Sequence, residues 1–216
     1  MTRLALHNYY RSSTSYRVRI ALAMKGLDYD YVAHHLRHGE HLEPPFRALN
    51  PQGLVPALVL EDGSVLTQSL AIIEYLDETH PEPPLLPRDA RGRARVRMIA
   101  QMIACDIHPV NNLRVLTSLR TLYGAGDDDV AGWFRHWVGE TFGPLEKILA
   151  ESPHTGRFCH GDVPGLADIC LVAQVANNQR FGVDMTPYPV IARINAACLD
   201  LPAFTKAAPQ NQPDAE

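Results

Sequence analysis

Hydroxyl side chains cluster where an apolar stretch gives way to a helical pattern near the start of the chain. Arg11 is followed directly by Ser12, Ser13 and Thr14. The first turn of a helix has free N–H groups and a partial positive charge, which lower the pKa of a thiol placed there. Hydroxyl groups add hydrogen bonds to such a sulfur. Because this turn contains no cysteine, the pattern predicts a sulfur that is supplied by a ligand.

Helix capping is the competing interpretation of the same turn. A Ser or Thr N-cap satisfies the first backbone N–H groups and accounts for one or two hydroxyls. Here Ser12, Ser13 and Thr14 follow one another directly after an arginine, which exceeds the need of a cap. On this stretch alone, a thiolate site and plain capping both stay open.

A β-α-β unit is expected to position the turn. The sequence predicts a strand over residues 4–9, a helix over 18–26 and a second strand over 29–34, connected by a right-handed parallel crossover. A buried strand over 57–60 and a returning strand over 65–67 are typical of a hairpin. The first part of the chain is therefore predicted to be α/β.

Two further features of this part suit a ligand. Val55 and Pro56 enter the buried strand tightly and are candidates for a cis bond that turns the Val55 backbone toward a ligand. Gln68 and Ser69 open a helix predicted over 68–79. A helix N-terminus with a hydroxyl is suited to a carboxylate, although capping explains Ser69 considered alone.

A proline-rich linker separates this part from a second one. Four prolines in residues 80–87 exclude a helix or strand interior, and every later periodic segment is helical. We therefore predict a ligand-binding domain over 1–80, a linker over 81–90 and an all-helical domain over 91–216. Residues 124–129 are expected to form a loop, and the tail from Pro209 is expected to be mobile.

The second part contains two local signals. Pro109 is expected to kink or break a helix, and His108 and Asn112, four residues apart, would share a face beside the kink. They are predicted to line a cleft, with a structural core histidine as the alternative for His108. Asp168 comes three residues after Gly165, the spacing of a capping box, and is predicted to be structural.

Composition excludes several classes of function. The chain has 216 residues and a formal charge of −4, which gives no reason to expect nucleic acid binding. No apolar run approaches the ~20 residues that span a bilayer, and the N-terminus lacks the features of a signal peptide. The four cysteines have no C-x-x-C spacing, so no metal site is predicted. Scattered thiols indicate a reducing compartment, and we expect a cytoplasmic protein.

Taken in order, these motifs resemble the cytosolic glutathione transferases over essentially the whole chain. The resemblance implies a thioredoxin-like α/β N-terminal domain followed by an all-α C-terminal domain. Residues 11–22 are similar to the signature of the zeta class, as are 68–76 and 184–189, and residues 105–112 resemble the form found in bacterial isomerases. Two positions depart from the pattern: Thr14 replaces a frequent cysteine, and Gly165 replaces the usual Ser or Thr cap.

The resemblance implies glutathione as cofactor and a glutathione-dependent cis-trans isomerase as activity. The family adds a thiolate to maleylacetoacetate, allows bond rotation and eliminates the thiolate to give fumarylacetoacetate. Alternatives are maleylpyruvate isomerisation, general glutathione conjugation or haloacid dehalogenation, and non-enzymatic glutathione binding. A site based on Tyr9 or Tyr10 is a further possibility. The resemblance also implies a homodimer, which an arginine-rich segment over 88–97 supports weakly.

The resemblance assigns roles to particular residues. Ser12, Ser13, Thr14 and Arg11 are the catalytic candidates. Arg11, Arg114 and Arg180 are candidates for binding the substrate carboxylates, because the planar guanidinium matches a carboxylate. Gln68 and Ser69 would hold the γ-glutamyl end of glutathione and the Val55 backbone its cysteinyl amide. The candidates for the glycyl end of glutathione or the cleft wall are His41, Gln52, His108 and Asn112.

Overall fold

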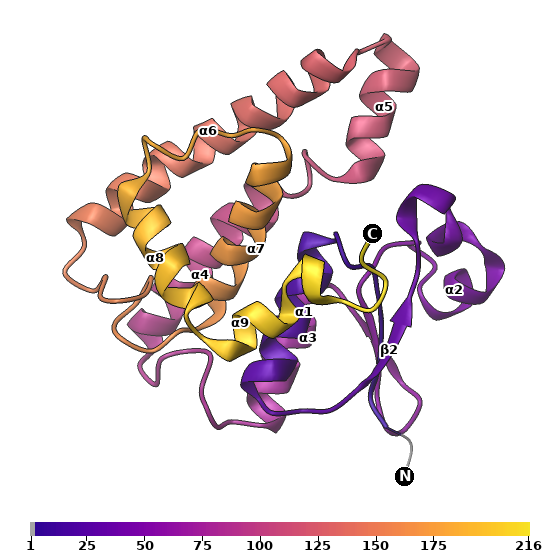
Figure 1. The fold of residues 1–216 in the computed structure, drawn as a ribbon. Coiled ribbons are helices and arrows are strands. Elements are labelled where there is room, and N and C mark those ends of the chain that lie inside the picture. The colour runs from indigo at the N-terminus through magenta and orange to yellow at the C-terminus, as the bar shows by residue number, and fades with distance from the viewer. Residues whose placement is uncertain (1–2) are drawn as a thin grey trace. The chain divides into compact units, whose positions relative to one another are not determined.

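The computed structural model describes residues 3–216 and divides them into two compact units (Figure 1). The first unit comprises the described residues up to Pro84 together with Asp200–Glu216, and the second is Leu85–Leu199. The predicted domain limits at residues 80 and 90 stay a prediction, to which the structure adds that residues 200–216 pack with the first unit.

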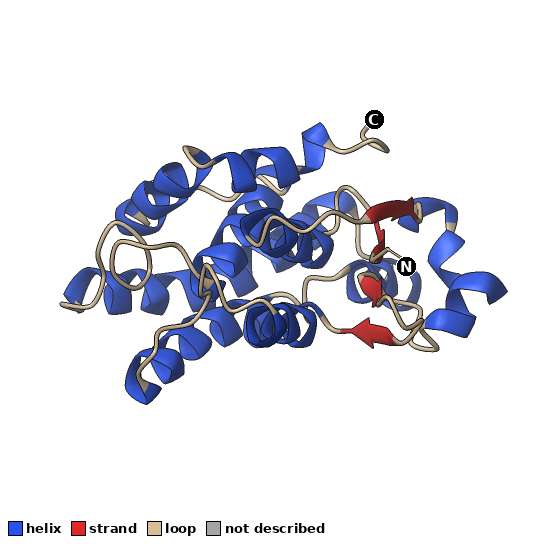
Figure 2. Ribbon diagram, turned by 90° about the horizontal axis from the view of Figure 1, so that it is seen from below, coloured by secondary structure: helices blue, strands red, loops and turns tan. Residues whose placement is uncertain are grey.

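The first unit contains the four strands of a mixed sheet (Figure 2). The strand order is β2-β1-β3-β4, in which β2 is parallel to β1 while β3 and β4 are antiparallel to their neighbours. The elements of this unit are β1 (Ala5–Asn8), α1 (Ser13–Met24), β2 (Asp30–Ala33), η1 (Leu36–His38), η2 (Glu40–Leu42), α2 (Pro44–Leu49), β3 (Ala57–Val59), β4 (Val65–Thr67), α3 (Ser69–Thr79), α9 (Pro202–Ala207) and η4 (Pro209–Asn211). The predicted thioredoxin-like α/β fold is confirmed.

Helix α1 is the centre of this unit. It packs against α3 and α9, and Val18, Ile20 and Leu22 are fully buried. Leu6 of β1 lies opposite Leu58 of β3, and both are inaccessible to solvent. Burial of such side chains stabilises the fold by roughly 1.5–3 kcal/mol each. Since α1 begins shortly after β1 ends, the same core fixes the position of residues 11–14, which we call the hydroxyl turn.

The second unit is entirely helical, as predicted. Its elements are α4 (Ala90–Gln101), η3 (Met102–Ile107), α5 (Leu113–Tyr123), α6 (Asp127–Glu151), α7 (Leu166–Arg180) and α8 (Pro189–Leu199). Helix α7 is the central one, because every residue from Leu166 to Val175 is buried and the helix packs against both α4 and α8.

Two expectations about loops are wrong. Within the predicted loop over 124–129, α6 already begins at Asp127, and the Asp129 carboxylate accepts a hydrogen bond from the Gly126 N–H at 2.9 Å. Acidic residues are favourable in the first turn of a helix, so the acidic cluster marks a helix start. The tail beyond Pro209 is held in place, since Asp214 accepts hydrogen bonds from the Tyr10 N–H and the Tyr31 hydroxyl.

Candidate functional site

The hydroxyl turn forms the start of α1. Ser12 is the N-cap, and its Oγ accepts a hydrogen bond from the Ser15 N–H at 3.2 Å. The helix therefore begins several residues earlier than predicted, and Ser13 and Thr14 lie in its first turn. Ser13 is buried, whereas Ser12 and Thr14 are partly exposed. Capping accounts for Ser12 as an acceptor but leaves its proton, and the Thr14 hydroxyl, for other partners.

Ser12 and Thr14 form a chain of hydroxyls that ends on Val55. The Thr14 hydroxyl donates to the Val55 carbonyl at 3.1 Å, and the oxygens of Ser12 and Thr14 are 2.8 Å apart. A threonine hydroxyl has one proton, so Ser12 supplies the proton of the bond that joins the two side chains. To donate to a bound sulfur, the Ser12 hydroxyl has to rotate away from Thr14.

Val55 lies at the end of a loop that is held in place by the side-chain amide of Asn50. Asn50 is buried, donates to the Leu54 carbonyl at 2.7 Å and accepts from the Gln52 N–H at 3.1 Å. The peptide bond between Val55 and Pro56 is cis, as the sequence predicts. The loop thus brings the Val55 backbone next to the α1 turn and directs Gln52 toward the start of α3.

The start of α3 is held in an unusual conformation. Gln68 has φ +68° and occupies the N-cap, so the prediction that Ser69 is the cap is wrong. Such backbone geometry costs roughly 1–3 kcal/mol and is concentrated at functional sites. The Gln68 side chain donates to Gln52 at 3.0 Å, while Ser69, the first helical residue, is buried and accepts from Arg17 at 3.4 Å.

Tyr9 and Tyr10 form part of the core rather than the site. Both are 3% exposed, their rings are 4.8 Å apart, and their hydroxyls are buried without a hydrogen-bond partner among residues 3–216. Burial raises the pKa of Tyr9 to about 12. These hydroxyls are closed off from solvent, so the structure favours the serine-based site over the tyrosine alternative.

Arg11 lies at the edge of the turn, half-buried, with its guanidinium 5.0 Å from the centre of the Tyr10 ring. The backbone before it is fixed from two sides. Arg19 donates to the carbonyls of Tyr9 and Tyr10, and the Asp214 carboxylate accepts from the Tyr10 N–H. A cationic group thus sits directly beside the hydroxyls on a backbone with little freedom to move.

His41 lies in η2 within a group of partly buried histidines. The Nδ1 atom of His41 is buried and has no hydrogen-bond partner in the described part of the chain. The rings of His7 and His34 contact each other through a hydrogen bond of 2.8 Å. Burial lowers the pKa of all three histidines. His41 is therefore neutral near pH 7 and suited to hydrogen bonding rather than to charge pairing.

In the second unit, α4 continues directly into a π-helix. Residues Met102–Ile107 form η3, and the His108 N–H donates to the Ile103 carbonyl, five residues back. Pro109 follows, so the predicted break is present. The expectation that His108 and Asn112 share a helical face is wrong, because η3 ends at Ile107. Asn112 instead caps α5 by accepting from the Val115 N–H at 3.2 Å.

Arg114 and Arg180 are both exposed and lie in different elements of the second unit. Arg114 is in the first turn of α5. Arg180 ends α7, donates to Asn177 at 3.3 Å and has its guanidinium 5.6 Å from the centre of the Phe181 ring. Both residues are exposed, so their guanidinium groups are accessible for a carboxylate ligand.

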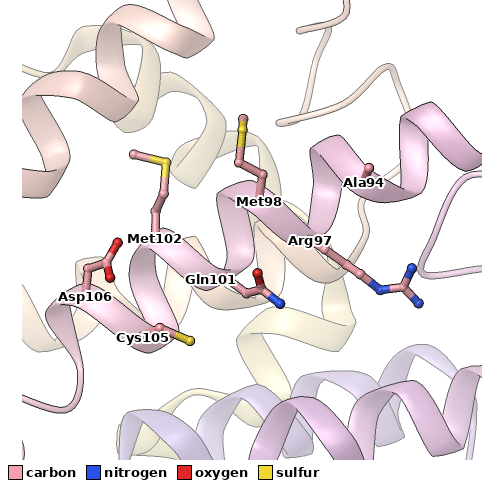
Figure 3. Close-up of a pocket in the computed structure, with 7 residues that line it drawn as sticks. All are labelled: Ala94, Arg97, Met98, Gln101, Met102, Cys105 and Asp106. Atoms are coloured by element: carbon pink, nitrogen blue, oxygen red, sulfur yellow. The ribbon is translucent and has the colours of Figure 1, made fainter.

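An open pocket lies along one face of α4 and η3 in this unit. Figure 3 shows flexible methionines beside polar side chains on successive turns. The lining combines long apolar side chains with amide and charged groups. The lining residues are Ala94, Arg97, Met98, Gln101, Met102, Cys105 and Asp106. The π-helix was not predicted, although π-helical turns are frequent at functional sites.

The buried thiols of the chain do not provide the nucleophile. Burial raises the pKa of Cys159 and Cys198, so both stay protonated. Asp168 next to them has the predicted structural role: its carboxylate accepts from the N–H groups of Gly165 at 2.9 Å and Cys159 at 2.8 Å. The described residues contain no group of three side chains that could hold a metal ion.

Three residues that position the site were missed by sequence reasoning. Arg17, Arg19 and Asp214 all contact the turn, its preceding strand or the start of α3. A signal for the arginines was present, because two charges within the apolar stretch that follows Tyr16 need buried partners. Nothing in the local sequence around Asp214 indicates that it contacts Tyr10, more than two hundred residues away in the chain.

The chain is similar to a known protein family and to individual members of it. A family model described as glutathione S-transferase, N-terminal domain, matches residues 6–84. A maleylpyruvate isomerase of Ralstonia sp. is 51% identical over 98% of this chain and 99% of its own. A maleylacetoacetate isomerase of Pseudomonas aeruginosa is 47% identical over 98% of both. A structure of maleylacetoacetate isomerase from Methylobacterium extorquens AM1 with bound malonate and GSH has a TM-score of 0.95 and 42% identity, covering 98% of this chain and 99% of that one.

The fold and these similarities define a glutathione transferase. More narrowly, the chain belongs to the zeta class of that superfamily, the maleylacetoacetate and maleylpyruvate isomerase family. The predicted family, fold class, enzyme class and glutathione cofactor are thereby confirmed. None of the helices in residues 3–216 is both long and apolar enough to cross a bilayer.

The first unit fits glutathione on its own geometry. Two helix starts, those of α1 and α3, carry hydroxyls, and the α3 start has neither a side-chain cap nor an acidic residue in its first turn. Free N–H groups at a helix start bind anions. Glutathione has a thiol that ionises, which suits the start of α1. It also has a carboxylate at its γ-glutamyl end, which suits the start of α3.

Proposed function

We propose that the protein is a glutathione-dependent cis-trans isomerase of a maleyl dicarboxylate, with maleylacetoacetate converted to fumarylacetoacetate. The observation that carries this proposal is the hydroxyl chain at the start of α1, beside Arg11 and the Val55 carbonyl. The full-length similarity to isomerases supports it. The dicarboxylate malonate bound in a related structure supports the substrate class.

When bound, glutathione supplies a thiolate that adds to the cis double bond and is later eliminated. The residues of this chain hold and orient that sulfur. The partial charge at the start of α1 and the rotated Ser12 hydroxyl stabilise the ionised form. Thr14 holds the Ser12 hydroxyl in the absence of ligand and keeps the Val55 carbonyl in position. Gln68 and Ser69 receive the γ-glutamyl end, whereas Gln52 and His41 are assigned to the glycyl end.

Arginines supply the electrostatic part of the reaction. Addition of a nucleophile next to a carbonyl generates negative charge on oxygen, which cationic donors stabilise. Arg11 is the first choice for this role because it adjoins Ser12 in the chain and lies beside the turn. Arg114 and Arg180 are assigned to the substrate carboxylates, since both guanidinium groups are exposed. His108 and Asn112 are assigned to the wall of the substrate site.

Maleylpyruvate is the second candidate substrate. The observation that favours it is the higher identity to the Ralstonia maleylpyruvate isomerase, 51% against 47% for the Pseudomonas maleylacetoacetate isomerase. The two substrates share the maleyl group and differ in the acyl tail. The reaction chemistry assigned to Ser12 and Arg11 is the same for both, so the choice depends on the pocket that receives the tail.

The test is a comparison of kcat/KM for both substrates, each with and without glutathione, followed by the change in ultraviolet absorbance. We expect turnover of at least one maleyl substrate that depends strictly on glutathione. Chlorodinitrobenzene and dichloroacetate are the control electrophiles. Conjugation or dehalogenation without isomerisation would refute the proposal in favour of a general transferase, and glutathione binding without turnover in favour of a binding protein.

We also propose that the protein is cytoplasmic and forms a homodimer. Four free cysteines support a reducing compartment. The helix α4 contains several arginines, which suit acidic groups on a second copy. Light scattering after size exclusion measures the assembly: a monomer at micromolar concentration would contradict the homodimer.

A further inference from the structure

Two arginines on α1 are buried to the same extent but differ in their partners. Arg17 and Arg19 are each 1% exposed. Arg19 uses all three nitrogens: Nη1 donates to Asn8 at 2.9 Å, Nη2 to the Tyr10 carbonyl at 2.9 Å and Nε to the Ala207 carbonyl at 3.0 Å. Arg19 therefore ties β1, the hydroxyl turn and α9 together, and its burial is explained by the fold.

Arg17 has no comparable set of partners. Its Nη1 donates one long hydrogen bond of 3.4 Å to the Ser69 hydroxyl. Its Nε and Nη2 are buried and make no hydrogen bond to any group in residues 3–216. A buried cation with unsatisfied donors is unfavourable unless an anion compensates it. The fold alone thus gives no reason for a charge at this position.

The partner of Arg17 opens the helix that lacks a cap. Ser69 is the first residue of α3. The side chain of the N-cap residue Gln68 makes no hydrogen bond to the N–H groups of this helix, and the first turn has no acidic residue. A serine hydroxyl that accepts from Arg17 keeps its own proton for a second acceptor. The free N–H groups of α3, the Ser69 proton and the buried charge of Arg17 all favour an anion at this point.

We infer that Arg17 is a positioning residue for glutathione: its buried charge acts through the Ser69 hydroxyl to hold the α-carboxylate of the γ-glutamyl end. The inference rests on the proposed function, which assigns that end of glutathione to Gln68 and Ser69. Arg17 does not contact the reacting sulfur. It sets the affinity for one carboxylate and leaves the chemistry at Ser12 unchanged.

Thermal stability separates this role from a structural one. Arg17→Met replaces the charge with an apolar chain of similar length, so the free protein should melt at the same temperature as the wild type or higher. Arg19→Met, the matched control on the same helix, should melt clearly lower, because it leaves the carbonyls of Tyr10 and Ala207 unpaired. If Arg17→Met melted as low as Arg19→Met, Arg17 would be structural and the inference overturned.

Binding of two ligands, measured by titration calorimetry without substrate, tests the carboxylate directly. The ligands are glutathione and 4-aminobutyryl-cysteinyl-glycine, which lacks only the α-carboxylate. We expect Arg17→Met to weaken glutathione binding roughly 10- to 100-fold, the range for a hydrogen bond to a charged group, and to leave the analogue unchanged. Arg17→Lys keeps a cation and should retain most of the preference for glutathione, which covers the case that the Met variant folds poorly.

The outcomes distinguish the inference from the proposed function. If the wild type prefers glutathione but Arg17→Met preserves the full preference, the inference about Arg17 fails while the ligand site stands. If the wild type binds both ligands equally, the placement of the γ-glutamyl end at Ser69 is wrong and the inference falls with it. A double variant of Arg17→Met and Ser69→Ala should lose no more affinity than Ser69→Ala alone, because Arg17 acts through the Ser69 hydroxyl.

Discussion

The starts of α1 and α7 are both capped by a polar side chain, and they differ in the polar groups that they leave available to a ligand. At α7, the Asp168 carboxylate satisfies two backbone N–H groups and is itself buried. At α1, Ser12 satisfies one N–H group, and the proton of its partly exposed hydroxyl is directed to Thr14. One helix start is closed by its cap, whereas the other can exchange a hydrogen bond within the protein for one to a ligand.

The difference shows how a functional cap is distinguished from a structural one. Both kinds of cap accept hydrogen bonds from backbone N–H groups, so capping alone does not show whether a helix start is functional. At α1 there are more polar groups than the backbone N–H groups require. They lie together with the cation of Arg11, directly before the cap, and the carbonyl of Val55 from a distant loop. The largest effects of mutation should therefore fall on stability at α7 and on activity at α1.

Asp168→Ala should have the largest effect. Two N–H groups, those of Cys159 and Gly165, would be left unpaired near the core, and we expect the free energy of unfolding to fall by roughly 2–5 kcal/mol. Urea unfolding measures the loss, and kcat/KM well below the melting temperature should change less than about twofold. A large loss of turnover in a fully folded Asp168→Ala protein would contradict the division between the two helix starts.

Ser12→Ala should have the opposite profile. Loss of a hydrogen bond to a charged sulfur lowers kcat/KM roughly 10- to 100-fold, while loss of the N-cap lowers stability by only about 1 kcal/mol. The pKa of the bound glutathione thiol, followed by ultraviolet absorbance of the thiolate, should rise. Full turnover in Ser12→Ala would remove the basis of the proposed site.

The sequence allowed much of this comparison to be predicted, for a physical reason. The hairpin, the cis bond after Val55, the motif at residues 11–14 and the capping box at Asp168 depend on local residue chemistry and could be located directly. The first residues of α1, α3 and α6 were nevertheless misplaced. Contacts distant in the chain were not accessible in this way. The shared helical face predicted for His108 and Asn112 was wrong because η3 ends at Ile107 and α5 begins only at Leu113. No local periodicity indicates the turn between them.

Asp214 makes hydrogen bonds to residues that are distant in the chain. Asp214→Ala tests how much these bonds contribute to stability and turnover. The variant loses the bonds to the Tyr10 N–H and the Tyr31 hydroxyl, and we expect about 1–2 kcal/mol less stability. Turnover should fall a few-fold, because the backbone before Ser12 becomes freer. Glu216→Gln, which removes only an exposed pairing with His35, is the control and should change neither quantity. Equal effects of the two variants would show that the tail does not fix the turn.

Acid should weaken the first unit more than the second. Burial lowers the pKa of His7, His34 and His41 below the ordinary value of 6.5, so the unfolded chain binds more protons than the folded one below that pH. Stability is then fully present above pH 6.5 and is lost as the pH falls through the lowered values. Urea unfolding between pH 7.5 and about pH 5 should show this slope, and His34→Gln should flatten it. If the free energy of unfolding of His34→Gln depended on pH as strongly as that of the wild type, His34 would be excluded as a source of the pH dependence.

Thr14→Val should have the smallest effect and decides which hydroxyl serves the sulfur. The variant removes the acceptor that holds the Ser12 proton and the donor to Val55. Because Ser12 is then free to donate to glutathione, we expect the thiol pKa to stay level or fall and kcat/KM to change less than about threefold, consistent with a net hydrogen bond of ~0.5 kcal/mol. Ser13→Ala, at a buried neighbour in the same turn, is the parallel control. If Thr14→Val instead lost as much activity as Ser12→Ala, Thr14 would be the donor to the sulfur and Ser12 only the cap, and the start of α1 would differ from that of α7 through Thr14.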